Sequence, residues 1–172
     1  ADDNFASIAQ AVEQGRTVYD NLKKAIVFLL PINGAEAMVI MAAVAIGVTL
    51  PVTPLQVLWI NMVSSVALAM ALAFEATEPD VMQRPPRRAD EAILSGFLLW
   101  RISLVSALIA SGVFAFFKLS LAQGASLEEA RTYAVNALVA MEVFYLFSVR
   151  FLRTPSFKLN QLFSSKATVI AV

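Results

Sequence analysis

The sequence predicts an all-α protein, a polytopic bundle of transmembrane helices that follows an N-terminal cytosolic stalk helix. Hydrophobic residues make up 59% of the 172 residues and charged residues only 15%, and the mean hydropathy is +0.71. The charges gather in a few stretches between long apolar runs, a pattern typical of an integral membrane protein. Four of these runs are long enough for helices of about 20 residues, the length that crosses a bilayer.

The predicted spans are joined by short connections. They cover approximately residues 25–46, 55–74, 97–117 and 133–149. Pro51 and Pro54 prevent helix continuation after the first span and predict a tight hairpin there. A further span is expected to begin near Ala167, inside the apolar run at the end of the sequence. We therefore expect this chain to be part of a longer protein.

The segment before the first span has the periodicity of an amphipathic helix. Apolar side chains recur there at three- and four-residue steps, at Ile8, Val12, Tyr19, Leu22 and Ile26. Since no proline interrupts the run before Pro31, we expect one helix to pass from the cytosol well into the bilayer. The alternative is an amphipathic helix that lies on the membrane surface.

The distribution of basic residues predicts the orientation of the bundle. Arginine and lysine concentrate in the entry segment and in the second and fourth connections, at Arg16, Lys23, Lys24, Arg84, Arg87, Arg88, Arg150, Arg153, Lys158 and Lys166. The proline hairpin has no basic residue, and in the third connection Lys118 and Arg131 are offset by two glutamates. Basic connections stay in the cytosol, so the N-terminus of the chain is predicted to be cytosolic.

Several classes of function do not fit the composition. The formal net charge is zero and no basic stripe is present, so a nucleic-acid partner is not expected. The chain has no cysteine and no histidine, which excludes disulfides, thiolate metal sites and imidazole catalysis. No glycine-rich phosphate loop is present. We therefore expect no catalytic and no cofactor-binding residues within this chain.

A carboxylate within an apolar run is the strongest sign of function. Glu36 lies in the first predicted span, and a charge near the middle of a bilayer costs about 2.5–3.5 kcal/mol even on a lenient scale. Asn33 precedes it by three residues, so the two side chains share a helix face and offer their oxygens to the same region. Pro31 should kink the span and free backbone carbonyls nearby. The alternative is a protonated glutamate that only packs.

Two other predicted spans carry polar groups. Asn61, Ser64 and Ser65 lie within about one turn of the second span, and Glu142 is a second carboxylate near the middle of the fourth. Serines also serve as packing residues between membrane helices, which makes Asn61 the better candidate. Oxygen donors that include two carboxylates suit a hard cation such as Ca²⁺, Mg²⁺, Na⁺, K⁺ or a proton.

Three stretches in the right order resemble the calcium-pump type of P-type cation-transporting ATPases. "ADDNFASIAQAVEQGRTVYDNLKKAIVFLL" is similar to the end of that family's phosphorylation domain and its stalk helix. "LQVLWINMVSS" resembles the following span, and "EPDVMQRPPR" the cytosolic loop after it. The resemblance covers essentially the whole chain and implies that it is the C-terminal membrane portion of such a pump. Residues 1–24 would then be the end of the phosphorylation domain and the stalk, and residues 25–172 the transmembrane domain.

The resemblance also implies a ligand set for the transported cation. The first span corresponds to the family's fifth membrane helix, on which Asn33 and Glu36 match an asparagine and a glutamate ligand. Asn61 and Ser64 fall on the asparagine and threonine ligands of the sixth helix, and Glu142 falls on the glutamate of the eighth.

Two positions depart from the pattern of the calcium pumps. Ser65 stands where they have an aspartate that bridges two ion sites, and Pro31 stands where they have a serine. Losing a carboxylate lowers the negative charge on which divalent ions depend. We therefore do not expect transport of two calcium ions.

From the resemblance we expect an ATP-driven cation pump in a bacterial plasma membrane. Its partners would be the lipid bilayer, an inorganic cation and the missing N-terminal domains of the same polypeptide. Those domains would bind Mg²⁺ and ATP, and this chain alone would not hydrolyse ATP. The alternative is a non-enzymatic, pump-derived membrane protein or a channel-like helical bundle.

Overall fold

The computed structural model describes residues 5–86 and 93–150, and all regular elements in that part of the chain are helical. They are α1 (Phe5–Ile46), α2 (Pro54–Ile60), the π-helix η1 (Asn61–Ser65), α3 (Val66–Ala73), the 3-10 helix η2 (Val81–Gln83), α4 (Gly96–Ala122) and α5 (Leu127–Val149). Because α2, η1 and α3 follow without a break, the described residues contain four helices long and apolar enough to cross a membrane. The all-α transmembrane prediction is confirmed. The span expected near Ala167 lies outside the described residues.

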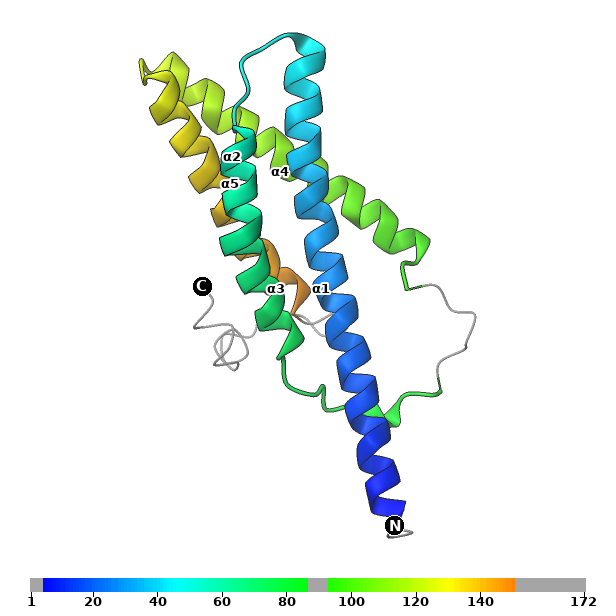
Figure 1. Cartoon of the computed structure of the whole chain (residues 1–172). Helices are drawn as coiled ribbons and strands as arrows, with labels where there is room; N and C mark the ends of the chain where they lie inside the picture. The colour runs from blue at the N-terminus through cyan, green and yellow to red at the C-terminus, as the bar shows by residue number, and fades with distance from the viewer. Residues whose placement is uncertain (1–4, 87–92, 151–172) are drawn as a thin grey trace.

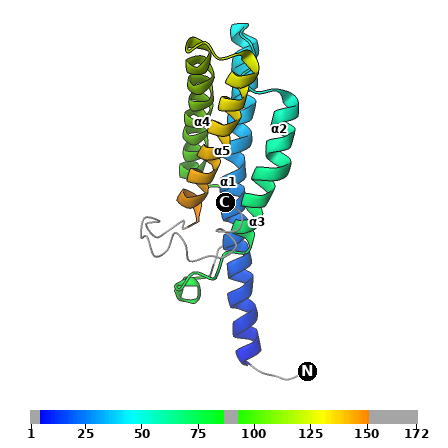
Figure 2. The same cartoon turned by 90° about the vertical axis from the view of Figure 1, so that its left-hand side faces the viewer.

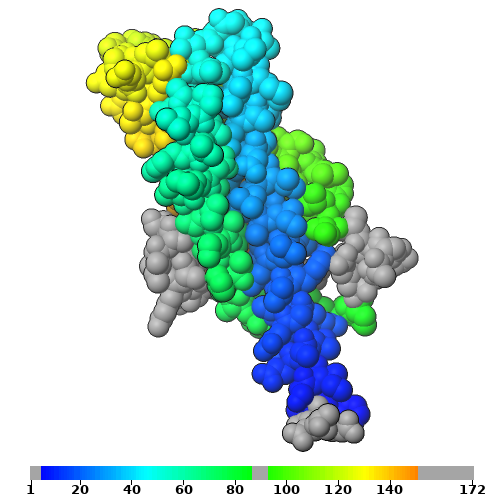
Figure 3. All heavy atoms as spheres, viewed as in Figure 1, coloured from blue at the N-terminus to red at the C-terminus, as the bar shows by residue number. Residues whose placement is uncertain are grey.

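Helix α1 is the central rod of the bundle. It lies between the α4–α5 pair on one side and the α2–η1–α3 rod on the other (Figures 1 and 2). The helix continues through Pro31, so the entry segment and the first span form one element, as predicted. Its N-terminal part projects beyond the other helices (Figure 3).

Local sequence signals fix the hairpin between α1 and α2. Gly47 has a positive φ of 71°, which costs little without a Cβ atom. The Val48 amide donates to the Ala43 carbonyl at 3.0 Å, the wide bond of a glycine-terminated helix end. Thr53 then caps α2, and Pro54 is its first residue, where the missing amide proton is no loss.

The connection between α4 and α5 is short, because both helices extend beyond the predicted spans of 97–117 and 133–149. Helix α4 ends at Ala122 and α5 begins at Leu127. The cause is local, because Gly124 ends α4 with a φ of 87° and Ser126 forms a capping box with Glu129.

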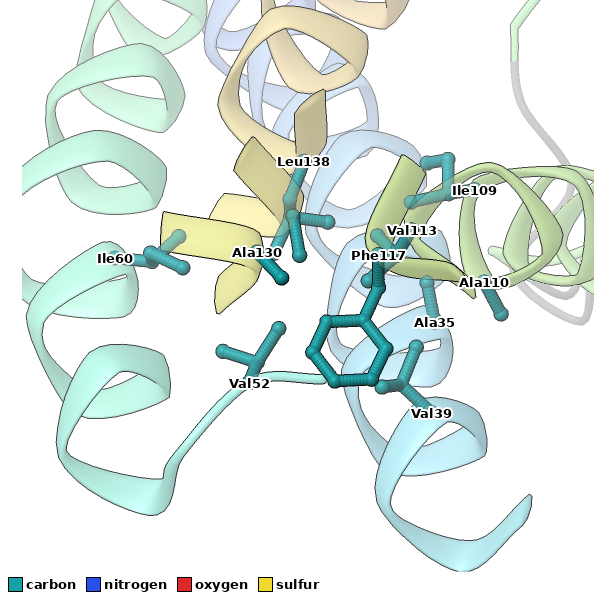
Figure 4. Packing of buried hydrophobic residues seen from close by; sticks show 11 residues of the cluster. Ala35, Val39, Val52, Ile60, Ile109, Ala110, Val113, Phe117, Ala130 and Leu138 are labelled. Atoms are coloured by element: carbon teal, nitrogen blue, oxygen red, sulfur yellow. The ribbon is translucent and has the colours of Figure 1, made fainter. Parts of the chain in front are cut away.

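Two apolar clusters hold the helices together. One joins Ala35 and Val39 of α1 to Phe117 of α4, Leu138 of α5 and Val52 of the hairpin (Figure 4). The second lies nearer the projecting end of α1, and its α1 members are Val27, Phe28 and Ile32. Glu36 lies between Ala35 and Val39 along α1, so it stands at the level of the first cluster, and the second cluster packs nearer the projecting end.

The connection after α3 is bound to the projecting part of α1. Asn21 donates to the backbone carbonyl of Glu75 at 2.8 Å, and Arg16 donates to the carbonyls of Val81 and Arg84, each at 2.8 Å. Lys24, which is 1% exposed, forms an ion pair of 2.7 Å with Glu78. These contacts fix the connection against the face of α1 just outside the apolar part of the bundle.

Arg84 is the centre of the charged contacts on this connection. Its guanidinium pairs with Glu78 and Asp80, each at 2.6 Å, and with Asp20 of α1. The hydrogen bonds that Arg84 donates to Asp80 are the main cause that raises its pKa above the ordinary value, and Asp20 and Glu78 add to it. The side chain thus stays charged and links the connection to α1.

Candidate cation-binding site

Glu36 of α1 is buried at the interface with the α2–η1–α3 rod. The residue is only 6% exposed. Its Oε2 accepts a hydrogen bond of 2.7 Å from Nδ2 of Asn61, whereas its Oε1 is buried without a hydrogen-bond partner among the described residues. A buried carboxylate oxygen without a donor is costly, and an unpaired group of this kind in a native structure requires an explanation.

Asn61 is held in place by a second contact. Its Nδ2 also donates to the Val57 carbonyl at 3.1 Å, one turn earlier in the same rod. Both bonds come from the amide nitrogen, and no hydrogen bond between described residues uses its side-chain carbonyl oxygen as an acceptor. Asn61 is also the first residue of the π-helix, an element that is rare in proteins and frequent at functional sites.

Glu142 of α5 is fully buried, with 0% exposure. The hydroxyl of Ser64 donates to its Oε2, and the hydroxyl of Ser65 lies 3.5 Å from its Oε1. Neighbouring residues of an α-helix point about 100° apart, and the wider π turn aims both hydroxyls at one carboxylate. The π-helix therefore joins Glu36 to Glu142 through its two ends.

The site combines two carboxylates, one carboxamide and two hydroxyls. The two carboxylates are linked through the same π-helix, Glu36 by Asn61 and Glu142 by Ser64. Neither carboxylate forms a salt bridge with another described residue. The described residues also contain no group of three or more His, Cys, Asp or Glu side chains that could hold a metal ion. A cation bound here would be held by the two carboxylates together with neutral oxygens.

A small cavity lies beside Glu36. Its volume is about 10 Å³, close to the space that one water molecule occupies. Apart from Glu36 its lining is apolar, formed by Val39, Ile40, Val52, Val57, Val113 and Leu138. An apolar lining lowers the effective dielectric around the carboxylate.

The structure brings together four of the five residues that the sequence indicated, and it leaves Asn33 apart from them. Glu36, Asn61, Ser64 and Glu142 form the connected set. Asn33 is exposed on α1. A separation of three residues leaves about 60° between two side chains around a helix. That angle carries Asn33 out of the interface in which Glu36 lies.

Ser65 joins this set although sequence reasoning did not include it among the ligands. It is 1% exposed and faces Glu142 beside Ser64. Two adjacent serines within an apolar span were the available signal. Ordinary helix geometry assigns them to different directions, so only the π-helix reveals that they face the same group.

Known proteins provide independent evidence on the family. Residues 49–172 match the family described as "Cation transporting ATPase, C-terminus". A protein of Mycobacterium tuberculosis named "Probable cation-transporting ATPase F" is 47% identical over 171 residues, which are 99% of this chain and 19% of that protein.

Two further relatives have related names. "Cation-transporting ATPase pma1" of Synechocystis is 49% identical over 148 residues, which are 86% of this chain and 16% of the relative. "Calcium-transporting ATPase" of Bacillus subtilis is 35% identical over 150 residues, 87% of this chain and 17% of the relative. The chain thus spans less than a fifth of the length of these curated relatives.

Proposed function

The chain belongs to the cation-transporting ATPase family, and from that premise we propose that the site between α1, η1 and α5 binds the transported cation of an ATP-driven pump. The chain is an integral membrane protein, and its described residues contain four membrane-length helices. The whole ATPase polypeptide that carries it is called the parent pump below. The bacterial relatives favour a bacterial plasma membrane as its location.

The unpartnered Oε1 of Glu36 is the observation that carries this proposal. Glu36 and Glu142 are two acidic groups buried within membrane-length helices, and neither has a basic partner among the described residues. Intramembrane acidic residues are expensive and usually serve an ion pathway. A cation seated between them would satisfy Oε1 and remove the repulsion between the carboxylates.

The donor set favours a cation of low total charge. Two carboxylates supply at most two negative charges from this half of the site, and Ser65 adds none. Divalent ions gain affinity with the number of charged ligands. We therefore propose one monovalent cation, a proton or one divalent cation. Calcium remains among the candidates, since one relative is named a calcium-transporting ATPase.

Asn33 is proposed as a further ligand from a different direction. It lies on the same helix as Glu36, and its side chain is exposed. Its exposed amide can serve the cation only if a part of the parent pump outside this chain closes over that face of α1. The missing domains would likewise supply the sites for Mg²⁺ and ATP.

The projecting part of α1 is proposed to connect the site with the phosphorylation domain. Ile8, Val12 and Leu22 of this part of α1 are 60%, 43% and 55% exposed. Exposed apolar side chains along one helix face favour contact with another domain. The relatives' names do not favour the alternative of a non-enzymatic membrane protein or channel-like bundle.

The test is cation-dependent phosphorylation of the parent pump. A screen of Na⁺, K⁺, Ca²⁺, Mg²⁺ and pH identifies the stimulating ion, and Glu36→Gln and Glu142→Gln are each expected to abolish the stimulation. Glu128→Gln is the matched control, because it removes the same charge from an exposed position on α5. Normal stimulation in Glu36→Gln would refute the proposed site.

A further inference from the structure

Pro31 leaves one carbonyl of α1 without its usual donor. In an α-helix the amide of a residue bonds the carbonyl four positions earlier, and proline has no amide proton. The carbonyl affected here is that of Val27. A buried carbonyl without a donor costs free energy, so the position of its replacement partner is informative.

Tyr145 of α5 supplies that partner. Its hydroxyl donates to the Val27 carbonyl at 3.0 Å in a buried contact between residues 118 positions apart. The ring is fixed on both sides, because it stacks on Phe28 with centroids 6.1 Å apart and carries the Arg101 guanidinium 5.7 Å from its centroid. The donor is thus held in one orientation by neighbours on α1 and α4.

A second side chain holds the same turn from α4. The Ser106 hydroxyl donates to the Pro31 carbonyl at 2.9 Å. Gly34 makes this approach possible, since a Cβ atom at position 34 would lie only 2.5 Å from Ser106 Oγ. The turn that contains Pro31 is therefore held by one hydroxyl from α4 and one from α5.

These contacts lie next to the candidate site on both helices. Tyr145 follows Glu142 by three residues on α5, and both side chains are buried within the bundle. Pro31 precedes Glu36 by five residues on α1. We propose that Tyr145, assisted by Ser106, is a positioning residue that fixes the axial position of α5 against α1 and so holds the two carboxylates at the separation the cation requires. This inference rests on the cation site proposed above.

A double-mutant cycle on the parent pump tests the inference. Pro31→Ala restores the amide that bonds Val27, and Tyr145→Phe removes the hydroxyl while keeping the ring. With Pro31 present, Tyr145→Phe should weaken the apparent affinity for the stimulating cation about tenfold, with the maximal phosphorylation level unchanged. In the Pro31→Ala background the same change should have no further effect, since the carbonyl no longer needs the hydroxyl.

Controls separate this inference from the proposed function. Tyr133→Phe removes a hydroxyl from an exposed tyrosine on the same helix and should leave the affinity unchanged. A second outcome is that Tyr145→Phe alone fails to fold. In that case the inference is upheld if the double variant Pro31→Ala/Tyr145→Phe folds and binds the cation with the affinity of Pro31→Ala, because the Tyr145 hydroxyl is then needed only when Pro31 is present. Equal losses in both backgrounds, or no loss with Pro31 present, would overturn the inference. Normal cation stimulation in Glu36→Gln would instead overturn the function on which it rests.

Discussion

Replacing Ser65 with aspartate is the change that most directly tests how ligand charge selects the cation. Ser65 is buried, and its hydroxyl lies 3.5 Å from Oε1 of Glu142. An aspartate there would place a second carboxylate about 4 Å from that of Glu142, where two unit charges repel by about 4 kcal/mol at an effective dielectric constant of 20. Without a cation, this repulsion destabilises the site or is relieved by uptake of a proton.

A divalent cation between the two carboxylates converts the repulsion into attraction. Part of the resulting gain in cation affinity is lost, because in the empty site a carboxylate can take up a proton, which the cation must then displace. We therefore expect Ser65→Asp to raise the affinity for divalent cations by about one to two orders of magnitude, or roughly 1.4–2.7 kcal/mol. Monovalent cations carry half the charge and should gain much less.

The assay is the concentration dependence of phosphorylation of the parent pump, compared for Ca²⁺, Mg²⁺, Na⁺ and K⁺. Ser65→Asn is the control, since asparagine has the shape of aspartate without its charge. The reasoning would be refuted if Ser65→Asn gave the same shift as Ser65→Asp, because size would then explain the effect. It would also be refuted if divalent and monovalent ions gained equally.

Three further predictions concern orientation, coupling and stability. A cysteine at exposed Ser126 should be labelled from outside the cell and one at exposed Thr77 only after permeabilisation, and the reverse pattern would overturn the orientation. Gly15→Pro should break α1, at a cost of about 3 kcal/mol or more, and uncouple cation binding from phosphorylation. The control Gly15→Ala should leave transport intact, because its Cβ would meet nothing within 4 Å. Unimpaired transport in the proline variant would show that α1 carries no motion. Glu78→Gln should lower the free energy of unfolding, measured by thermal denaturation, by about 3–5 kcal/mol. The reason is that Lys24, at 1% exposure, would stay buried without its charged partner. An unchanged melting temperature would show that Lys24 reaches solvent or another acceptor.

Much of the fold follows from local properties of the sequence. The apolar runs have the length of membrane helices, and the periodicity before Pro31 predicted one continuous helix, which α1 confirms. The helix ends also depend on neighbouring residues. The capping signals at Gly124, Ser126 and Glu129 set the facing ends of α4 and α5, and both helices extend beyond the apolar spans that hydropathy predicts.

The sequence by itself determined which acidic residues lie within the apolar spans, since an acidic group among apolar neighbours has few ordinary explanations. Only the tertiary structure decided which of them meet. Glu36 contacts Asn61 across 25 residues and Ser64 contacts Glu142 across 78, whereas Asn33, close to Glu36 in sequence, stays exposed. The role of Tyr145 was equally invisible, because its partner is a backbone carbonyl 118 residues away. Hydrophobicity and helix period act over a few residues, but the relative rotation and sliding of packed helices depend on all their contacts together, and that geometry decides which oxygens face one another.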